Sequence, residues 1–264
     1  MKYSVCLDLL YLEMTPHGPV FADTEKILAG MELAKKTGFD CVEFWDWANK
    51  DVEKLLAKQK ELGLTVTSLC AKDRGTLADP STHEKALEGL KETIAVAKRF
   101  GCNTIIVTAD EMPGFSREES HKNIVEAFKA QAALAKQEGV VLILEPICFP
   151  VPGFFRDSAE PMAVIEEVGS ENLKLLYDIF HYQLMEGNIA NTLRKYIDKI
   201  GHIHVAAAPH RTEITDGELN YNYLLGLLKE LNYDKYVTLE YMPTMEKEAS
   251  LLACKKMLTF WPYG

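Results

Sequence analysis

The feature that most constrains this chain is an alternation of short apolar runs with longer segments of helical periodicity, repeated along the sequence. Each run is rich in Val, Ile and Leu, as strands covered on both faces are. The eight runs are YSVCL, CVEFW, TVTSLC, TIIVTA, VVLILEP, LKLLYDI, HIHVA and YVTLEY, near residues 5, 43, 67, 106, 143, 176, 204 and 238.

Helical segments lie between these runs, and several stop at a glycine. The ranges 24–38, 52–63, 82–101 and 116–139 each end in glycine, a common helix stop, and a last helix is expected over about 245–257. Strands that alternate with helices predict parallel β/α units, and 264 residues divided by eight gives 33 per unit. We therefore predict a single domain, residues 1–264, folded as a (β/α)8 TIM barrel.

The main alternative architecture is an open, doubly wound sheet. Such a sheet usually carries a glycine-rich phosphate loop after its first strand. The corresponding turn here reads LLYLEMTPHG and contains no G-x-G-x-x-G motif. The sequence therefore favours the barrel.

Charge and cysteine pattern argue against several classes of function. The chain carries 29 Lys and Arg against 39 Asp and Glu, a net charge of −10, so it should repel phosphate backbones and bind no nucleic acid. No apolar stretch reaches the ~18 residues of a membrane span, so no membrane partner is expected. The N-terminus lacks signal-peptide features, and the six cysteines form no CxxC pair, which predicts buried thiols and a cytoplasmic location.

An ionisable side chain ends each of the last four predicted strands. Catalytic groups of barrel enzymes sit at these carboxyl ends. Buried carboxylates repel one another and are costly unless paired, and a divalent cation between them removes the repulsion. Two Glu, one Asp and one His suit Mn²⁺ or Mg²⁺, with Zn²⁺ or Co²⁺ as alternatives. The predicted metal ligands, which we call the quartet, are Glu145, Asp178, His204 and Glu240.

Three further polar residues lie close to the quartet in sequence. His181 follows Asp178 by three residues and could either polarise a substrate oxygen or hold Asp178 in place. Arg211, seven residues past His204, could bind a substrate carboxylate or hydroxyl group, or lie on the surface. His202 shares a strand face with His204 and is expected deeper in the barrel.

A metal between two glutamates indicates a particular reaction. The cation would polarise an α-hydroxy carbonyl substrate and stabilise the enediolate formed when a carbon-bound proton leaves. Glu145 and Glu240, from the fifth and eighth strands, could flank that substrate as an acid/base pair. This chemistry is isomerisation or epimerisation, and it needs no redox cofactor.

The chain resembles the xylose-isomerase-like barrel superfamily and, within it, the hydroxypyruvate isomerases. The resemblance rests mainly on LEPICFPVPGFF, DIFHYQLMEGNI, GHIHVAAAPHR, GELNYNYLL and VTLEYMP, with looser agreement in GFDCVEFW. It implies a metal site at the quartet, acid/base roles for Glu145 and Glu240, and substrate contacts from His181 and Arg211. The implied reaction converts hydroxypyruvate to tartronate semialdehyde.

The chain departs from these patterns at several positions. Hydroxypyruvate isomerases carry glutamine where this chain has His204, and histidine there is usual in ketose 3-epimerases of the D-tagatose and D-psicose kind. Those epimerases carry a second glutamate at the place of Val151. The segment AKDRGTLADPSTHEK also differs from the hydroxypyruvate isomerase pattern. A ketose 3-epimerase or another sugar isomerase is therefore the alternative function.

Other interpretations concern the substrate and more distant classes. Val151 offers no hydrogen bond to a sugar hydroxyl, and nearby aromatic residues would narrow the pocket. Both features favour a short substrate, whose carboxylate Arg211 would bind. Those aromatic residues are Trp45, Trp47, Phe149, Phe154 and Phe155. An endonuclease IV-like nuclease would need a trinuclear zinc site and a basic surface, which seven His and the acidic charge disfavour. The intact quartet disfavours a non-catalytic sugar-binding barrel. A homo-oligomer remains an open alternative, because related barrels often pair through their helices.

Overall fold

The computed structural model describes residues 1–16, 18–148 and 153–259. Within these ranges, nine strands form one sheet in which all neighbours are parallel, in the order β5-β4-β1-β11-β10-β9-β8-β7-β6. The strands are β1 (Lys2–Cys6), β4 (Cys41–Glu43), β5 (Thr65–Val66), β6 (Leu69–Cys70), β7 (Thr104–Val107), β8 (Val141–Leu144), β9 (Leu173–Asp178), β10 (Ile200–Val205) and β11 (Tyr236–Leu239).

The two end strands of this sheet, β5 and β6, belong to one predicted run, TVTSLC. β5 pairs with β4 and β6 pairs with β7, and only Thr67 and Ser68 separate them in the chain. The two short strands therefore close the sheet into a ring of eight strand positions, which confirms the (β/α)8 prediction. We call the point between β5 and β6 the seam.

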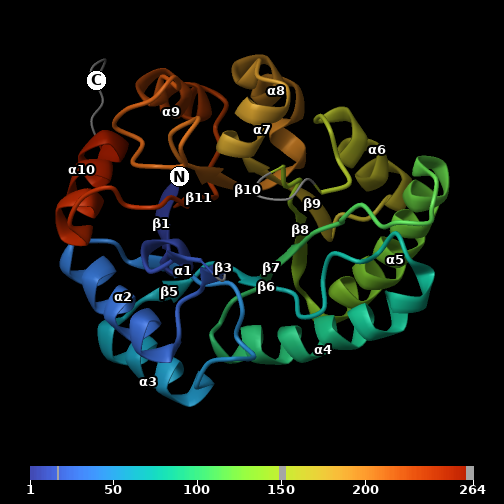
Figure 1. Ribbon diagram of the computed structural model, residues 1–264, viewed down its shortest axis with the longest axis horizontal. Helices are drawn as coiled ribbons and strands as arrows, with labels where there is room; N and C mark the ends of the chain where they lie inside the picture. Colours follow the sequence, from blue (N-terminus) through green and yellow to red (C-terminus); the bar gives the residue numbers. More distant parts are fainter. Residues whose placement is uncertain (17, 149–152, 260–264) are drawn as a thin grey trace.

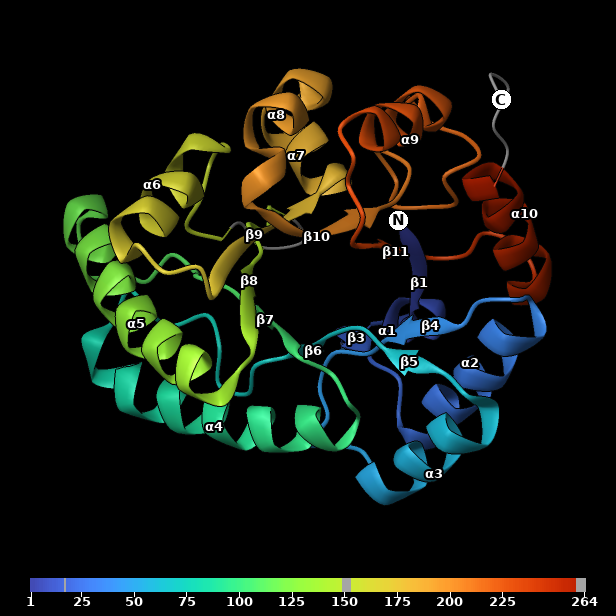
Figure 2. The same cartoon turned by 180° about the vertical axis from the view of Figure 1, so that it is seen from behind.

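Helices form an outer ring around the strands (Figures 1 and 2). A helix follows every strand position, as the alternation predicts. They are α1 (Leu7–Leu10), α2 (Thr24–Lys36), α3 (Val52–Leu62), α4 (His83–Arg99), α5 (Arg117–Glu138), α6 (Ala159–Val168), α7 (Ile179–Met185), α8 (Ile189–Tyr196), α9 (Tyr221–Glu230) and α10 (Lys247–Thr259), with short 3₁₀ turns at Pro80–Thr82 and Ile197–Lys199.

Local sequence signals set the ends of these helices. Ser116 and Glu119 form a reciprocal capping box at the start of α5, so the first backbone N–H groups find acceptors. Gly63 and Gly139 end α3 and α5 in the left-handed conformation that glycine adopts without strain. Among the described residues, none of the helices is both long and apolar enough to cross a membrane.

A small antiparallel hairpin between β1 and α2 was not predicted. It consists of β2 (Glu13–Thr15) and β3 (Gly18–Val20). Each strand has three residues and one contains Pro19, so neither shows an alternation that a sequence pattern could detect. The hairpin supplies Met14 and Pro19 to the cavity described below.

Side chains alternate along each barrel strand between the helix layer and the barrel interior. On β9, for example, Leu175 and Tyr177 belong to the main core, whereas Leu176 lies in a separate small cluster. That cluster, which we call the apolar half of the interior, comprises Cys70, Ile106, Ile143 and Leu176. The strands opposite contribute buried polar side chains, the polar half, comprising Ser4, Glu43, Thr67, His202 and Thr238.

Candidate active site

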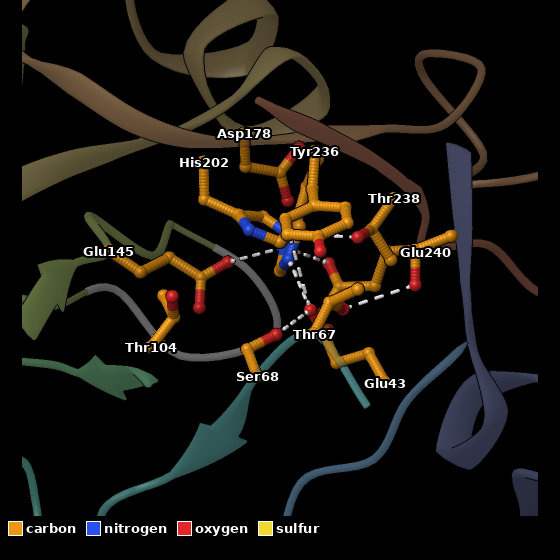
Figure 3. Close-up of polar contacts among 12 residues, drawn as sticks. Glu43, Thr67, Ser68, Thr104, Glu145, Asp178, His202, Tyr236, Thr238 and Glu240 are labelled. Carbon is orange, nitrogen blue, oxygen red and sulfur yellow. Dashed lines mark hydrogen bonds and ion pairs between the residues drawn. The ribbon is translucent and has the colours of Figure 1, made fainter. Parts of the chain in front are cut away.

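The four predicted ligands meet at the carboxyl end of the barrel. Glu145 and Glu240 directly follow β8 and β11, Asp178 ends β9, and His204 lies in β10. All four are buried, with exposed fractions of 6% or less. One ligand atom from each lies within 4.8 Å of every other, so the quartet can hold one metal ion. Figure 3 shows Glu145, Asp178 and Glu240 approaching from their separate strands.

The distances inside the quartet centre on one nitrogen of His204. Nδ1 lies 3.3 Å from Oε1 of Glu145 and 3.2 Å from Oε2 of Glu240. Nε2 on the other side of the ring lies 3.2 Å from Oε2 of Glu43. One edge of the imidazole therefore faces the two glutamates of the quartet, and the other faces the barrel interior.

Two buried atoms of the quartet have no hydrogen-bond partner among the described residues: Nδ1 of His204 and Oδ2 of Asp178. Leaving such atoms unpaired away from water is costly. Both are of a type that ligates metals. Nδ1 of His204 faces oxygens of Glu145 and Glu240, and Oδ2 of Asp178 lies 3.5 Å from Nε2 of His181 and from Nη2 of Arg211. The set of three carboxylates and one imidazole nitrogen therefore fits a divalent cation.

Local structure fixes Oδ1, the other carboxylate oxygen of Asp178. This oxygen accepts hydrogen bonds from the backbone N–H groups of Phe180, at 2.8 Å, and His181, at 3.4 Å. Asp178 is thus the N-cap of α7, which restrains the carboxylate. The other oxygen stays directed at the quartet.

The charged groups of the quartet shift one another's pKa values. Burial and the charge of Glu240 raise the pKa of Asp178 to about 7, and the same two causes raise that of Glu145. Burial also opposes ionisation of Glu240, but the nearby His204 and Arg211 more than offset it and lower its pKa. Burial likewise disfavours the charged form of His204, but Glu240 and Glu43 raise its pKa well above the usual value.

A cavity of about 480 Å³ opens beside the quartet. Glu145 and Glu240 reach it, together with His181 and Arg211, the two predicted substrate contacts. The remaining wall is mostly apolar and comes largely from the first two loops of the barrel: Leu9, Leu12, Met14, Pro19, Phe21 and Trp45, with Cys70, Arg74, Thr108, Ile147 and Met242 elsewhere.

His181 and Arg211 are both buried beside the quartet rather than on the surface. Nε2 of His181 lies 3.5 Å from Oδ2 of Asp178. Burial and the charge of Arg211 lower the pKa of His181 to about 3, so its imidazole is neutral. The Arg211 guanidinium bonds to Glu240 through Nη2, which also lies 3.5 Å from Oδ2 of Asp178. The surface interpretation of Arg211 is therefore wrong.

His202 takes the deeper position that the strand alternation predicts. It is fully buried, and its Nε2 hydrogen-bonds to Oγ1 of Thr238 at 2.8 Å. It also lies 3.4 Å from Oε2 of Glu43. His202 does not reach the cavity.

The aromatic residues expected around the substrate are distributed differently. Trp45 lines the cavity and packs against Phe21, with ring centroids 5.7 Å apart. Trp47 instead donates its Nε1–H to Thr93 of α4, and Phe154 and Phe155 are buried against each other away from this cavity. Loop side chains can turn into the helix layer, which spacing alone does not reveal. Phe149 and Val151 lie outside the described residues.

Two polar residues near the site were not singled out from sequence. Glu43 ends β4 and contacts both histidines of β10. Arg74 lines the cavity, and its Nη1 bonds to Oδ1 of Asp46 at 2.9 Å. A signal existed for Glu43, because it too ends a barrel strand with an ionisable group. Arg74 lies in a loop, where no periodicity marks it.

Three carboxylates and a histidine around one point could hold a metal ion, and the cavity beside them could admit a small polar molecule. The profile of the xylose isomerase-like TIM barrel family matches residues 31–256, and the chain belongs to this family.

Individual relatives agree with this membership. The hydroxypyruvate isomerase of Escherichia coli (strain K12) is 36% identical over 235 residues, covering 85% of this chain and 91% of that protein. The 2-oxo-tetronate isomerase of Cupriavidus necator is 33% identical over 230 residues, covering 83% and 88%. These relatives place the chain among isomerases.

A crystal structure described as an AP endonuclease, family 2, from Brucella melitensis has a TM-score of 0.85 to this chain. The match covers 95% of this chain and 96% of that chain at 22% identity. At this identity the likeness shows the fold alone.

Proposed function

We propose that this protein is a metal-dependent isomerase of a small α-hydroxy carbonyl compound, and that it converts hydroxypyruvate to tartronate semialdehyde. The observation that carries the proposal is the convergence of Glu145 and Glu240 on Nδ1 of His204, at 3.3 and 3.2 Å, at the edge of a cavity. The name of the Escherichia coli relative supports the choice of substrate. The six thiols, all unpaired, support a cytoplasmic location.

The quartet would hold the cation, with Mn²⁺ or Mg²⁺ expected first and Co²⁺ or Zn²⁺ as alternatives. When bound, the cation would stabilise negative charge on neighbouring substrate oxygens. The buried, unpaired donor atoms of the quartet support this assignment.

Glu145 and Glu240 would move the protons. One carboxylate removes a proton from C3 of hydroxypyruvate, and the electron pair left behind gives an enediolate. The other carboxylate delivers a proton to C2, and the hydroxyl proton of C3 passes to the oxygen on C2. The product is tartronate semialdehyde, and no electrons leave the substrate, so no redox cofactor is needed.

His181 and Arg211 would position the substrate. The neutral His181 imidazole faces the cavity and can donate a hydrogen bond to a substrate oxygen. Arg211 would bind the carboxylate with its guanidinium fork. The apolar wall around Trp45 and Phe21 offers few partners for the hydroxyl groups of a longer sugar, which favours a short substrate.

A substrate screen tests the proposal and its main alternative, a ketose 3-epimerase, which the histidine ligand favours. The purified protein is stripped of metal, supplied with Mn²⁺ or Mg²⁺, and assayed with hydroxypyruvate, 2-oxo-tetronate, D-fructose and D-tagatose. We expect the highest kcat/KM for hydroxypyruvate. Efficient C3 epimerisation of a ketose without turnover of hydroxypyruvate would establish the alternative.

Isotope incorporation tests the proton transfer. In D₂O, the product should carry deuterium on the carbon next to its carbonyl group. Glu145→Gln and Glu240→Gln should each lower kcat at least ~100-fold, because each removes a positioned acid/base group. Product without solvent deuterium would indicate a hydride shift and contradict the two-glutamate mechanism.

Two arginine variants test carboxylate binding. Arg211→Lys keeps the charge beside Glu240 but loses the fork, so it should raise KM for hydroxypyruvate more than for a neutral ketose. Arg74→Ala is the comparison, because Arg74 lines the same cavity and is likewise ion-paired, with Asp46. If KM for hydroxypyruvate rises only in Arg74→Ala, the substrate carboxylate is bound by Arg74 and not by Arg211.

A further inference from the structure

Glu43 is a wholly buried carboxylate to which the reaction assigns no role. It ends β4, on the interior side of the quartet, and none of its atoms reaches the substrate cavity. Its Oε2 accepts hydrogen bonds from the Ser68 hydroxyl and from Nε2 of His204, at 3.2 Å for the histidine. Figure 3 shows Glu43 and Ser68 on the opposite side of the cluster from Asp178 and His202.

The bond from His204 to Glu43 decides which ring nitrogen carries a proton. An ionised carboxylate can only accept hydrogen bonds, so Nε2 of His204 must carry a hydrogen and donate it. A histidine that binds a cation is neutral, so in the metal-bound state of the proposed function a ring with its proton on Nε2 has its lone pair on Nδ1. Nδ1 is the atom that faces Glu145 and Glu240 and has no hydrogen-bond partner among the described residues.

We propose that Glu43 is a positioning residue that holds His204 with Nδ1 directed at the metal. The inference rests on the metal centre of the proposed function. A carboxylate behind a metal-binding histidine fixes the ring orientation and makes the ligating nitrogen more basic. Glu43 would thereby raise the affinity of the quartet for its cation without touching cation or substrate.

The surroundings of Glu43 favour this role. Ser68 lies in the seam between β5 and β6, and its hydroxyl donates a hydrogen bond to the Glu43 carboxylate. One oxygen of Glu43, Oε2, therefore meets two donors, the Ser68 hydroxyl and Nε2 of His204.

A second metal site is the competing interpretation, since Glu43, His202 and His204 also place one ligand atom each within 4.8 Å of one another. One contact argues against it: Nε2 of His202 is engaged with the Thr238 hydroxyl at 2.8 Å. All three residues are fully buried, and none of them lines the cavity beside the quartet.

Calorimetric titration of the metal-stripped protein with Mn²⁺ tests the proposal. Glu43→Gln keeps the size of the side chain but removes its charge, and its amide can turn an N–H toward His204. We expect Mn²⁺ affinity to fall ~10–100-fold, the usual range for partners behind a ligand. Thr238→Val is the matched control from the same buried layer, and it should leave the affinity unchanged.

A spectroscopic readout separates positioning from general loss of structure. In Mg²⁺-loaded protein with ¹⁵N-labelled histidine, the Nε2–H of His204 should give a downfield proton signal that Glu43→Gln shifts and Thr238→Val does not. If Glu43→Gln does not fold, Ser68→Ala serves instead. It keeps the carboxylate but removes one of its donors, and a smaller loss of affinity is expected.

The outcomes distinguish this inference from the proposed function. Equal Mn²⁺ affinity in wild type and Glu43→Gln, with an unchanged His204 signal, would overturn the positioning role alone. Two Mn²⁺ ions per chain, one of them lost in Glu43→Gln, would establish the second metal site instead. Failure of the wild type to bind Mn²⁺, Mg²⁺, Co²⁺ or Zn²⁺ would overturn the metal centre itself.

Discussion

The two halves of the barrel interior differ in what their buried side chains contact. In the apolar half, Ile106, Ile143 and Leu176 pack against one another with Cys70. In the polar half, hydroxyl, imidazole and carboxylate groups pair across strands, as in the Ser4–Thr67 and His202–Thr238 bonds at 3.1 and 2.8 Å. The same strand geometry thus supports two kinds of interior.

The difference shows which half the site depends on. Buried polar groups are costly unless each finds a partner, and aliphatic side chains can fill a barrel interior without that cost. The polar half nevertheless keeps Glu43 and two histidines, and one of these, His204, belongs to the quartet. Glu145 follows β8 and Asp178 ends β9, the strands that carry Ile143 and Leu176 of the apolar half. We infer that the apolar side chains themselves mainly stabilise the fold and that the polar half supports the site through His204.

The largest effect expected from this comparison is loss of the metal. Chelation should abolish activity, and Mn²⁺, Mg²⁺ or Co²⁺ should restore it. Asp178→Asn and His204→Ala should lose metal affinity and nearly all activity but stay folded, because strand-end residues on this face serve the site more than the core. Circular dichroism and metal titration check both points. Full activity in excess chelator, with the protein shown to be free of metal, would contradict a metal-binding role for the quartet.

A large truncation in the apolar half should have the opposite effect: it should lower stability and leave metal affinity unchanged. Ile106→Ala removes a fully buried side chain from β7, a strand that contributes no member of the quartet. The free energy of unfolding should fall by about 2–5 kcal/mol, as for other buried Ile to Ala changes, with metal affinity unchanged. Urea denaturation and metal titration measure the two quantities. A fall in metal affinity with little change in stability would show that the halves are not separable.

The smallest effect is expected in the polar half away from the quartet. Thr67→Val keeps the shape but removes the hydroxyl that pairs with Ser4 at 3.1 Å and with the Val42 carbonyl at 3.2 Å. Stability should fall by about 1–3 kcal/mol, because the buried Ser4 hydroxyl loses its partner. The kcat should be unchanged. A loss of activity as large as that in Asp178→Asn would indicate that the whole polar half belongs to the site.

Much of the fold could be predicted because its signal is local. The eight apolar runs correspond to the eight strand positions, and glycines mark helix ends at Gly63 and Gly139. The seam could not be predicted, because TVTSLC reads as one continuous strand. The β2–β3 hairpin is too short to carry a period.

The candidate site also has a part that could be predicted from the sequence and a part that could not. The quartet could be predicted because each member follows an apolar run that ends at the catalytic edge of the barrel. Glu43 was overlooked because Phe44 and Trp45 continue the apolar pattern after it. Its partner His204 is 161 residues away in the chain, and no local pattern carries that contact.

The seam also has a consequence for the dynamics of the molecule. β5 and β6 each pair with a neighbouring strand over only two residues. The seam therefore has the fewest strand-to-strand residue pairs in the described sheet. Local opening should begin there, so the amide protons of β5 and β6 should exchange with solvent faster than those of β10. Each opening would also separate Ser68 from Glu43. Metal binding and barrel closure should therefore be linked, and cation loading should slow amide exchange at the seam.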